Sequence, residues 1–346
     1  MLSTATMDNE RFIRRMPKVE LHVHLEGSVR PETLLKLAKH HKIPLPADTI
    51  EGLREWYVFR NFDHFIEIYM AISNCLRTPE DIELLTREFI AGQAEQHILY
   101  SEVTFTPYNQ LLNCGLGMHE QLDAVNRARA WGEKELGVTM GMIVDIPRER
   151  SIEAGEAIAQ FVVDRYGDGI IALGLGGPEP GNPASKFREA FAMVHAAGIP
   201  CVVHAGETEG PPSIWDAIET AKPRRIGHGV RCIEDTDLMA YLKRTQLPLE
   251  VCPTSNVCLR VWTSMEKHSL PHLIAYGLNV TLNSDDPPLF NTTLTDEYLR
   301  CSAQFAWGRT FITGLVGNAL EVSLLPDEEK HAMREQVRRS FSLANT

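Results

Sequence analysis

The amino-acid sequence predicts an α/β protein built as a (β/α)8 barrel, the TIM barrel, in which helices surround eight parallel strands. Short apolar runs alternate with helical patterns along the chain, and this alternation is typical of a parallel sheet. Eight such runs are present, which favours closure into a barrel. An open, doubly wound sheet is the alternative, but no Gly-x-Gly-x-x-Gly motif follows the first run to support it.

The predicted strands are short and are bounded by glycine or polar residues. They cover residues 19–25, 98–105, 139–146, 170–176, 200–204, 225–228, 248–252 and 279–283. Helices are predicted over residues 31–40, 119–136, 186–197, 213–221, 236–244 and 265–276. The 346 residues fit one barrel of roughly 250 residues with insertions, and no Gly/Ser linker divides them. We therefore expect residues 1–346 to form a single domain.

Two segments stand outside this repeating pattern. Residues 47–96 are too long for one helix, and a second helix is predicted from Thr78. The apolar positions of the first helix follow the i, i+3, i+4, i+7 spacing of an amphipathic helix: Phe62, Phe65, Ile66 and Tyr69. We interpret this segment as a helical insertion after the first strand. Residues beyond Pro287 are predicted to add C-terminal helices on the outside of the barrel.

Composition excludes several classes of partner. The net charge of −12 argues against nucleic acid, because nucleic-acid binding usually depends on a basic surface. No run of about 18 apolar residues predicts a membrane span, and residues 1–16 lack the apolar centre of a signal peptide. The seven cysteines are scattered and form no CxxC pair, which indicates a reducing compartment. We expect a cytoplasmic protein; its oligomeric state cannot be derived from the sequence.

Histidines and carboxylates gather where the predicted strands end. His22 and His24 close the first strand, and because they are two residues apart they point to the same face. The ends of the fifth, sixth and eighth strands contribute His204 with Glu207, His228, and Asp285 with Asp286. Each residue alone has a structural explanation as a core histidine, a tight turn or a helix cap. Together they meet at the end of the barrel that carries active sites.

Such a gathering of ionisable groups predicts a metal site. Buried ionisable groups are costly unless they are paired or bind a metal. Three imidazoles and one carboxylate suit Zn²⁺ with one position open for water, and we choose the ligands His22, His24, His204 and Asp285. Iron and manganese accept the same ligand types. The sequence therefore predicts one divalent ion per chain, with zinc preferred.

Five segments together resemble the successive motifs of the adenosine deaminase family. They begin with Glu20-Leu21-His22-Val23-His24-Leu25-Glu26-Gly27-Ser28 and His204-Ala205-Gly206-Glu207. The others are Arg225-Ile226-Gly227-His228-Gly229, Glu250-Val251-Cys252-Pro253-Thr254-Ser255-Asn256 and Asn283-Ser284-Asp285-Asp286-Pro287. The motifs occur in the family's order from about residue 14 to about residue 345. This order makes the resemblance specific at the level of the family.

The resemblance implies a role for each site residue. Zinc held by the four ligands activates a water, which attacks C6 of a 6-aminopurine. Glu207 donates a proton to N1, and His228 orients the water or takes its proton. Asp285 acts in catalysis as well as in metal binding, and Asp286 faces N7. Gly177 offers its backbone N–H to N3, where a side chain would block the approach.

The resemblance also implies further substrate contacts, by His24, Glu26, Phe62 and Phe65. Glu26 stands where adenosine deaminases carry an aspartate that recognises the ribose 5′-hydroxyl. Adenine deaminases typically read Ile-Asp-His-Gly at the sixth strand, whereas this chain has Gly227, which we expect to leave room beside a sugar. Phe62 and Phe65 match the family's helical lid, although their spacing equally fits an amphipathic core.

The exact substrate stays open at this level. We expect hydrolytic deamination of a 6-aminopurine nucleoside, adenosine or a close relative. Residues 102–108 and 177–179 look like those of a bacterial subgroup in which some members deaminate 6-aminodeoxyfutalosine, a menaquinone precursor with a benzoate-type group at its 5′ end. Arg148, after the third strand, either binds that carboxylate at the rim or is a solvated loop residue. Glu26 disfavours the first of these, because two carboxylates repel each other.

Two further alternatives are an adenine deaminase and a metal-dependent amidohydrolase acting on an amide or lactone. Glu207 and Asp286, at positions that face a purine in the family, argue against the amidohydrolase. A non-catalytic binding protein on the same scaffold would be expected to have lost a metal ligand or the acid, and the sequence retains them all.

Overall fold

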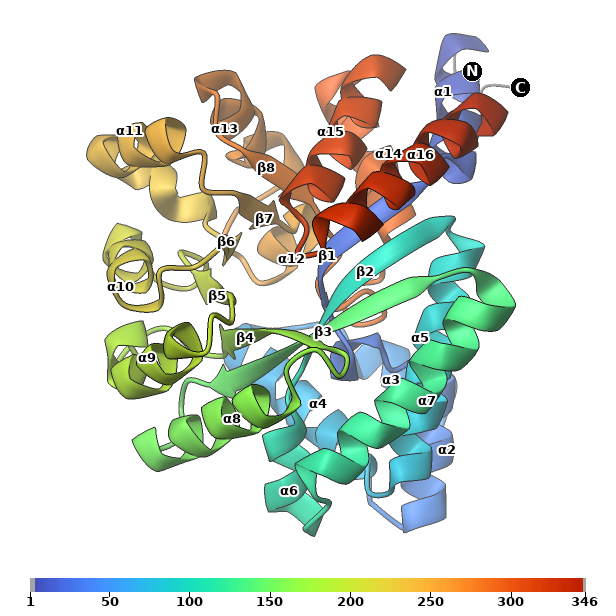
Figure 1. Cartoon of the computed structure of the whole chain (residues 1–346). Coiled ribbons are helices and arrows are strands. Elements are labelled where there is room, and N and C mark those ends of the chain that lie inside the picture. Colours follow the sequence, from blue (N-terminus) through green and yellow to red (C-terminus); the bar gives the residue numbers. More distant parts are fainter. Residues whose placement is uncertain (1–3, 345–346) are drawn as a thin grey trace.

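Eight parallel strands form the centre of the molecule in the computed structural model, which describes residues 4–344 and the side chains of residues 8–342. Their sheet order follows the chain from β1 to β8, and helices surround them (Figure 1). The strands are β1 Lys18–His24, β2 Ile98–Phe105, β3 Thr139–Pro147, β4 Ile170–Gly176, β5 Cys201–Ala205, β6 Arg225–His228, β7 Leu249–Val251 and β8 Val280–Leu282. This arrangement confirms the predicted TIM barrel.

The barrel closes through a residue that follows β8. The backbone N–H of His24 donates to the carbonyl of Asp285 (2.9 Å), and the N–H of Asp285 donates to the carbonyl of His22 (3.1 Å). A parallel bridge between Val23 and Asp285 results. Closure of the barrel therefore places Asp285 directly beside the two histidines at the end of β1.

The strand predictions agree with the structure to within one residue at either end. Strands buried on both faces read as continuous apolar runs, and these runs were the signal for them. All seven residues of β1 are buried, including its glutamate and both histidines. The polar residues of β1 thus point into the barrel rather than to solvent.

The outer helices follow the predicted pattern, with one correction. They include α7 Met118–Leu136, α8 Ile152–Arg165, α9 Arg188–Ala196, α10 Pro211–Ala221 and α11 Thr236–Thr245. The single helix predicted over residues 265–276 is wrong: a 3₁₀ turn, η4 Met265–Lys267, is followed by a break and then by α13 Leu270–Tyr276. Pro271 lies in the first turn of α13, where its missing N–H leaves no helical bond unmade, and so it marks a helix start.

The helix predicted over residues 31–40 is α2 Pro31–His41. The predicted insertion over residues 47–96 consists of three helices, α3 Ile50–Trp56, α4 Phe62–Cys75 and α5 Pro79–Glu95. The start of α5 is set by a capping box, in which Thr78 and Asp81 satisfy each other's backbone N–H. Side chains of α4 line a cavity at the carboxyl ends of the strands, so the insertion covers that end of the barrel.

The predicted C-terminal helices are α14 Leu294–Phe305, α15 Arg309–Val322 and α16 Asp327–Ala344, and α1 Thr4–Arg15 precedes the barrel. The stacked rings of Phe12 and Phe341, 6.1 Å apart, join α1 to α16, so the two ends of the described chain lie together (Figure 1). Within residues 4–344, no helix has the length and apolar character needed to cross a membrane. The cysteines described by the structure are all free, as the sequence predicts.

Candidate active site

A cavity of about 150 Å³ lies at the carboxyl ends of the strands, beneath α4. It brings together residues that the sequence places up to 262 positions apart, from His24 at the end of β1 to Asp286 after β8. Predicted site residues that line it are His24, Phe62, Phe65, Gly177, His204, Glu207, His228, Asp285 and Asp286. His22 lies just below them, and Glu26 and Arg148 are not part of the lining.

Three of the distances that join the four predicted metal ligands have the length expected in a tetrahedral site. Oδ1 of Asp285 lies 3.4 Å from His22 Nε2 and 3.3 Å from His24 Nε2. His24 Nε2 lies 3.1 Å from His204 Nε2. Zinc–ligand bonds of about 2.0–2.1 Å arranged tetrahedrally give ligand separations of roughly 3.3 Å. These three distances fit a zinc site, and the ligand atoms of His22, His204, His228 and Asp285 also lie within 4.8 Å of one another, so His228 stands beside the predicted ligands.

Hydrogen bonds behind two of the histidines aim their Nε2 atoms at this centre. Nδ1–H of His22 donates to Glu250 Oε2 (2.8 Å), and Nδ1–H of His204 donates to the carbonyl of Leu175 (3.0 Å). In the neutral rings both Nε2 atoms then carry lone pairs, and that of His22 has no hydrogen-bond partner among the described residues. Although burial opposes it, Asp285 and Glu250 raise the pKa of His22 to about 10, so its Nε2 favours binding a proton or a cation. Buried lone pairs without a donor are costly, and a cation fits them.

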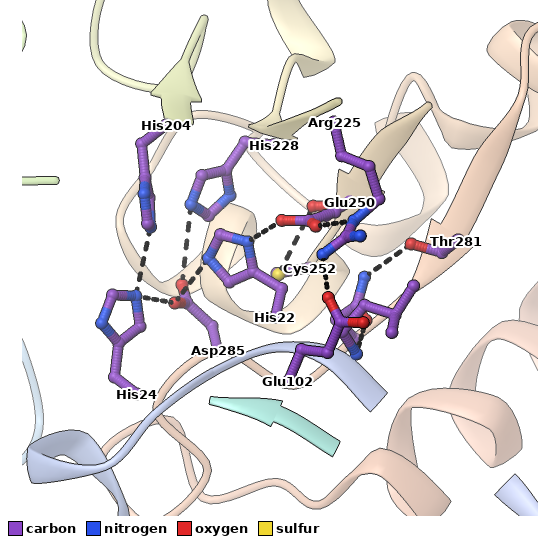
Figure 2. A network of polar contacts seen from close by, with 12 residues as sticks. His22, His24, Glu102, His204, Arg225, His228, Glu250, Cys252, Thr281 and Asp285 are labelled. Atoms are coloured by element: carbon purple, nitrogen blue, oxygen red, sulfur yellow. Dashed lines mark hydrogen bonds and ion pairs between the residues drawn. The ribbon is translucent and has the colours of Figure 1, made fainter. Parts of the chain in front are cut away.

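Figure 2 shows this cluster and the ion pairs behind it. Glu250, the partner of His22, also accepts from Nε of Arg225 (2.5 Å). Arg225 in turn pairs with Glu102 on β2. This buried chain of charges holds the His22 imidazole in place from inside the barrel. The sequence analysis did not predict roles for Glu102 or Arg225, because a charged residue inside an apolar strand gives no indication of its partner.

Two residues of the site, His228 and Asp285, have an unusual backbone conformation. His228 and Asp285 adopt left-handed conformations, with φ of 60° and 68°. Residues other than glycine rarely adopt positive φ, and such strain occurs preferentially at functional sites. At His228 the turn brings Nε2 to 3.6 Å from Glu207 Oε2 and 3.9 Å from Asp285 Oδ2. Burial lowers the pKa of His228 to about 4, so the ring is neutral near pH 7.

Glu207 has the properties of a buried acid. Burial, together with the charges of Asp285 and Glu179, raises the pKa of Glu207 well above its usual value. A second carboxylate, that of Glu179, holds the surrounding turn by accepting from the backbone N–H groups of Gly206, Glu207 and Thr208, each at 2.8 Å. The carboxyl of Glu207 thus lies at the cavity, and its raised pKa favours the protonated form, which can donate a proton.

Comparisons with known proteins agree with this geometry. A family model described as adenosine deaminase matches residues 17–340. The chain belongs to the adenosine deaminase family. Its relatives include an aminodeoxyfutalosine deaminase of Streptomyces avermitilis, 38% identical over 321 residues, which cover 92% of this chain and 89% of the relative. An adenine deaminase of Vibrio parahaemolyticus is 37% identical over 327 residues, 94% of this chain and 96% of the relative.

The solved structures agree. The crystal structure of an adenine deaminase from Arthrobacter aurescens is similar to this chain with a TM-score of 0.89 at 32% identity, covering 94% of this chain and 98% of that one. The protein is therefore a hydrolytic deaminase that acts on a C–N bond of an aminopurine-like substrate. The prediction of its family and class of reaction is confirmed.

Two glycines of the deaminase motifs make room for site residues. A Cβ atom at Gly27 would lie 1.6 Å from Asp286 Oδ1, so any side chain there would displace that carboxylate. A Cβ atom at Gly227 would lie 2.7 Å from Cε1 of His22. Our expectation that Gly227 leaves room beside a sugar is wrong: the residue accommodates a metal-ligand ring and does not line the cavity.

Asp286 and Gly177 both line the cavity. Burial and the neighbouring Asp285 raise the pKa of Asp286 well above its usual value. Its Oδ1 is buried with no hydrogen-bond partner among the described residues. Gly177 has φ of 94°, which disfavours any other residue. Phe62 and Phe65 line the cavity, and Phe65 also stacks on Phe290 (5.6 Å), so it serves as cover and as core.

The deaminase structure corrects both of our expectations for Arg148. Its side chain is fully buried rather than solvated, and it does not reach the rim. Nη1 donates to the carbonyl of Asn182 (2.7 Å), and Nη2 donates to the carbonyl of His204. Arg148 also holds the pKa of Glu179 below its usual value, although burial alone would raise it. Arg148 therefore supports the floor of the site from below.

Replacing Arg148 by methionine is expected to lower the free energy of unfolding by roughly 3 kcal/mol, because two buried carbonyls lose a charged donor and Glu179 loses its compensating cation. Urea denaturation of the purified protein measures this. Arg150→Met is the matched control, since Arg150 is partly exposed and should change stability by less than about 1 kcal/mol. Equal stability of the two variants would contradict the structural role.

Glu26 also differs from expectation. It belongs to the 3₁₀ helix η1 (Glu26–Ser28) and is fully buried. Its carboxylate accepts from the N–H of Thr106 (3.0 Å) and from the hydroxyl of Tyr69 (3.1 Å), and these two residues separate it from the cavity. Burial and the nearby Asp145 raise the pKa of Glu26 to about 8. Glu26 can influence a substrate only through Tyr69 and Thr106.

The sequence analysis missed Asp145, which lines the cavity at the end of β3. Its Oδ1 accepts from the hydroxyl of Thr106 (2.6 Å). Burial raises the pKa of Asp145 to about 6. The signal was available, since Asp145 lies near the end of a predicted strand, as the other site residues do. A single carboxylate without a neighbouring histidine did not stand out.

Proposed function

We propose that this protein is a zinc-dependent deaminase that converts a 6-aminopurine nucleoside, adenosine or a close relative, to the 6-oxopurine and ammonia. One observation carries the proposal: Glu207, whose pKa is raised, lines the same cavity as His24, His204 and Asp285 of the histidine and aspartate cluster. The family membership supplies the class of reaction. The roles below are our assignments for this chain.

Zinc at this site would lower the pKa of a bound water towards 7 and so supply a nucleophile at neutral pH. Glu207 donates a proton to purine N1, which prevents negative charge from building on the ring as the oxygen adds to C6. The protonated Asp286 donates a hydrogen bond to N7, and the backbone of Gly177 meets N3. The proton of the oxygen that has added to C6 passes to the 6-amino group, which leaves as ammonia as the carbonyl of the 6-oxopurine forms, and the proton that the bound water lost restores the acid form of Glu207.

The charge of the cavity favours a neutral nucleoside. Among the described residues that line it there is no lysine or arginine, whereas Asp145 and Glu149 are carboxylates. Asp145 can accept a hydrogen bond from a ribose hydroxyl. Away from the metal, a negatively charged group held within the cavity would have no cationic side chain to pair with and would be repelled.

Ammonia release across adenosine, deoxyadenosine, adenine and 6-aminodeoxyfutalosine tests the assignment. We expect kcat/KM for a nucleoside to exceed that for free adenine. A preference for free adenine over every nucleoside would overturn the nucleoside assignment but leave the deaminase assignment intact. Absence of ammonia from all four substrates, with metal bound, would overturn the proposed function itself.

Asp145→Ala is expected to lower kcat/KM for adenosine by about 10- to 100-fold, because a hydrogen bond to a charged acceptor contributes about 1.5–3 kcal/mol. Free adenine, which has no hydroxyl to bind, should be affected only a few-fold. Asp145→Asn is the control, since asparagine keeps the shape and one acceptor oxygen without the charge. Its kcat/KM for adenosine should lie between those of the parent and of Asp145→Ala. Steady-state kinetics with both substrates decide; a parallel loss on adenine would remove Asp145 from ribose binding.

A second candidate substrate is supported by specific observations. Relatives named aminodeoxyfutalosine deaminase, from Streptomyces avermitilis and Streptomyces coelicolor, are 38% and 36% identical to this chain. Arg150 lies behind the cavity lining, where it donates to Asn109 (3.1 Å) and pairs with Glu149 (3.5 Å). This arginine, rather than Arg148, could meet a carboxylate that extends beyond the cavity. A higher kcat/KM for 6-aminodeoxyfutalosine than for adenosine would favour this candidate.

A further inference from the structure

A chain of buried hydrogen bonds runs from the back of His228 to the start of an outer helix. Asn256 lies in α12 (Pro253–Cys258), and His268 lies in the break between η4 and α13. His228, Asn256 and His268 are all at most 1% exposed. Neither Asn256 nor His268 lines the cavity, so neither touches a substrate. Their polar atoms nevertheless join end to end, and each contact restricts the next.

The chain of hydrogen bonds ends at a backbone N–H group, which can only act as a donor. The backbone N–H of Leu270, the first residue of α13, points at Nδ1 of His268 at 3.0 Å. A backbone N–H can only donate, so Nδ1 of His268 carries a lone pair and no proton. Burial lowers the pKa of His268 to about 3, and the ring is therefore neutral. Its one proton must lie on Nε2.

The orientation of the Asn256 amide follows from that proton. Nε2–H of His268 donates to Oδ1 of Asn256 (3.1 Å), which leaves the amide NH₂ facing His228. Rotating the amide by 180° would set two donors against each other at His268, so that arrangement is excluded. Nδ2–H of Asn256 then donates to Nδ1 of His228 (3.2 Å). Nδ1 of His228 is an acceptor, and its neutral ring carries the proton on Nε2.

We propose that Asn256 and His268 are positioning residues that hold His228 in its Nε2–H tautomer, so that His228 gives a hydrogen bond to the attacking oxygen and does not take its proton. Nε2 of His228 faces Glu207 and Asp285 across the cavity. Its other nitrogen is occupied by Asn256, so neither ring nitrogen offers a free lone pair to the water. This inference rests on the proposed function for its consequence, and it decides between the two roles that the sequence left open for His228.

The tautomer can be measured without substrate. Holoenzyme labelled with ¹⁵N at histidine, studied by two-bond ¹H–¹⁵N correlation, reports each ring nitrogen as protonated or unprotonated. We expect a protonated Nε2 and an unprotonated Nδ1 for His228, identified by the signals that His228→Gln removes. A protonated Nδ1 with an unprotonated Nε2 would overturn the proposal. Because no turnover is involved, this result is independent of whether the proposed function holds.

Two variants of His268 test the relay as a matched pair. Both lose the acceptor for the Leu270 N–H, but only glutamine can place an amide N–H against Oδ1 of Asn256. We expect His268→Gln to keep kcat within about threefold of the parent, and His268→Leu to lose about tenfold or more, as for a lost hydrogen bond to the reacting atom. KM should change less than kcat in His268→Leu, since His228 meets the attacking oxygen rather than the bound purine.

The same pair has a spectroscopic readout that loss of packing alone would not produce. In His268→Leu the amide of Asn256 is free to turn, so the His228 signals should show a mixture of tautomers, whereas His268→Gln should keep the parental signature. If His268→Leu keeps both the parental kcat and the parental His228 signature, the relay does not set the tautomer. Equal losses of kcat in the two variants would likewise reject the role, because they share the damage to α13.

Discussion

Asp285→Ala is expected to lose most of its metal and to reduce kcat/KM by about 10³-fold or more. The carboxylate is the one anionic group among the four proposed ligands, and its Oδ1 lies within 3.4 Å of the Nε2 atoms of both His22 and His24. Its second oxygen faces His228, so one side chain serves metal binding and the reacting oxygen together. A bound metal contributes several kcal/mol of charge stabilisation to hydrolysis, which corresponds to a factor of this size.

The measurement is metal content per chain beside the rate of ammonia release. Asp285 closes the barrel through its backbone and adopts φ of 68°, so alanine there could also disturb the fold. Asp285→Asn is therefore the control: asparagine tolerates positive φ and keeps the shape, but it removes the negative charge. Both variants should lose metal. Full occupancy with normal turnover in either would exclude Asp285 from the site.

Glu207→Gln is expected to fold and to keep its metal, but to lower kcat by about 10²-fold or more, the usual cost of removing a general acid. The glutamine amide can still donate a hydrogen bond to N1, so KM should change much less. The turn that carries the residue is held by backbone contacts to Glu179, which the substitution leaves intact. Glu209→Gln, on an exposed neighbour in the same turn, should leave the kinetics unchanged.

The pH profile gives Glu207 a second signature. Burial raises its pKa, so the acid form that donates the proton is present at low pH and is lost as the pH rises through that pKa. We expect kcat/KM of the parent to fall on the alkaline side for this reason. The corresponding limb should be absent from the Glu207→Gln profile, since an amide does not titrate. If the variant keeps the alkaline limb at the same pH, the limb belongs to another group. If kcat of Glu207→Gln stays within a few-fold of the parent, the proton comes from elsewhere.

Much of the site was predictable because it obeys two rules of regular structure. Residues two apart on a strand share a face, which is why His22 and His24 could be paired from the sequence. Parallel strands all end on the same side of a barrel, which is why His204, His228 and Asp285 could be gathered although they are far apart in the chain. Both rules depend only on the two-residue repeat of a strand and on its direction, and not on the residues that pack against it.

The same rules fail where the chain leaves a strand. Arg148 and Arg150 follow β3 two positions apart, and the sequence offers no reason to separate them. Pairing with β4 continues beyond the strand, with the N–H of Arg148 donating to the carbonyl of Gly176 (2.8 Å). This contact turns the Arg148 side chain beneath the site, towards carbonyls of residues 182 and 204, and leaves Arg150 partly exposed. Hydrogen bonds to residues far away in the sequence therefore decide that Arg148 is buried and Arg150 is not.

The sequence by itself therefore determined the barrel and the family, and it predicted which histidines and carboxylates gather at one end of the barrel, because periodicity and strand direction are local properties of the chain. Only the tertiary structure decided what each group faces. Glu26 lies behind Tyr69 and Thr106 instead of facing the cavity, and Asp145 takes a place in the lining that no motif marked. The backbone N–H of Leu270, 42 residues beyond His228 in the chain, fixes the position of the proton on His228. It does so through the hydrogen bonds that join His268 to Asn256 and Asn256 to His228. Such contacts depend on the packing of elements that have no relation in sequence, and no local pattern encodes them.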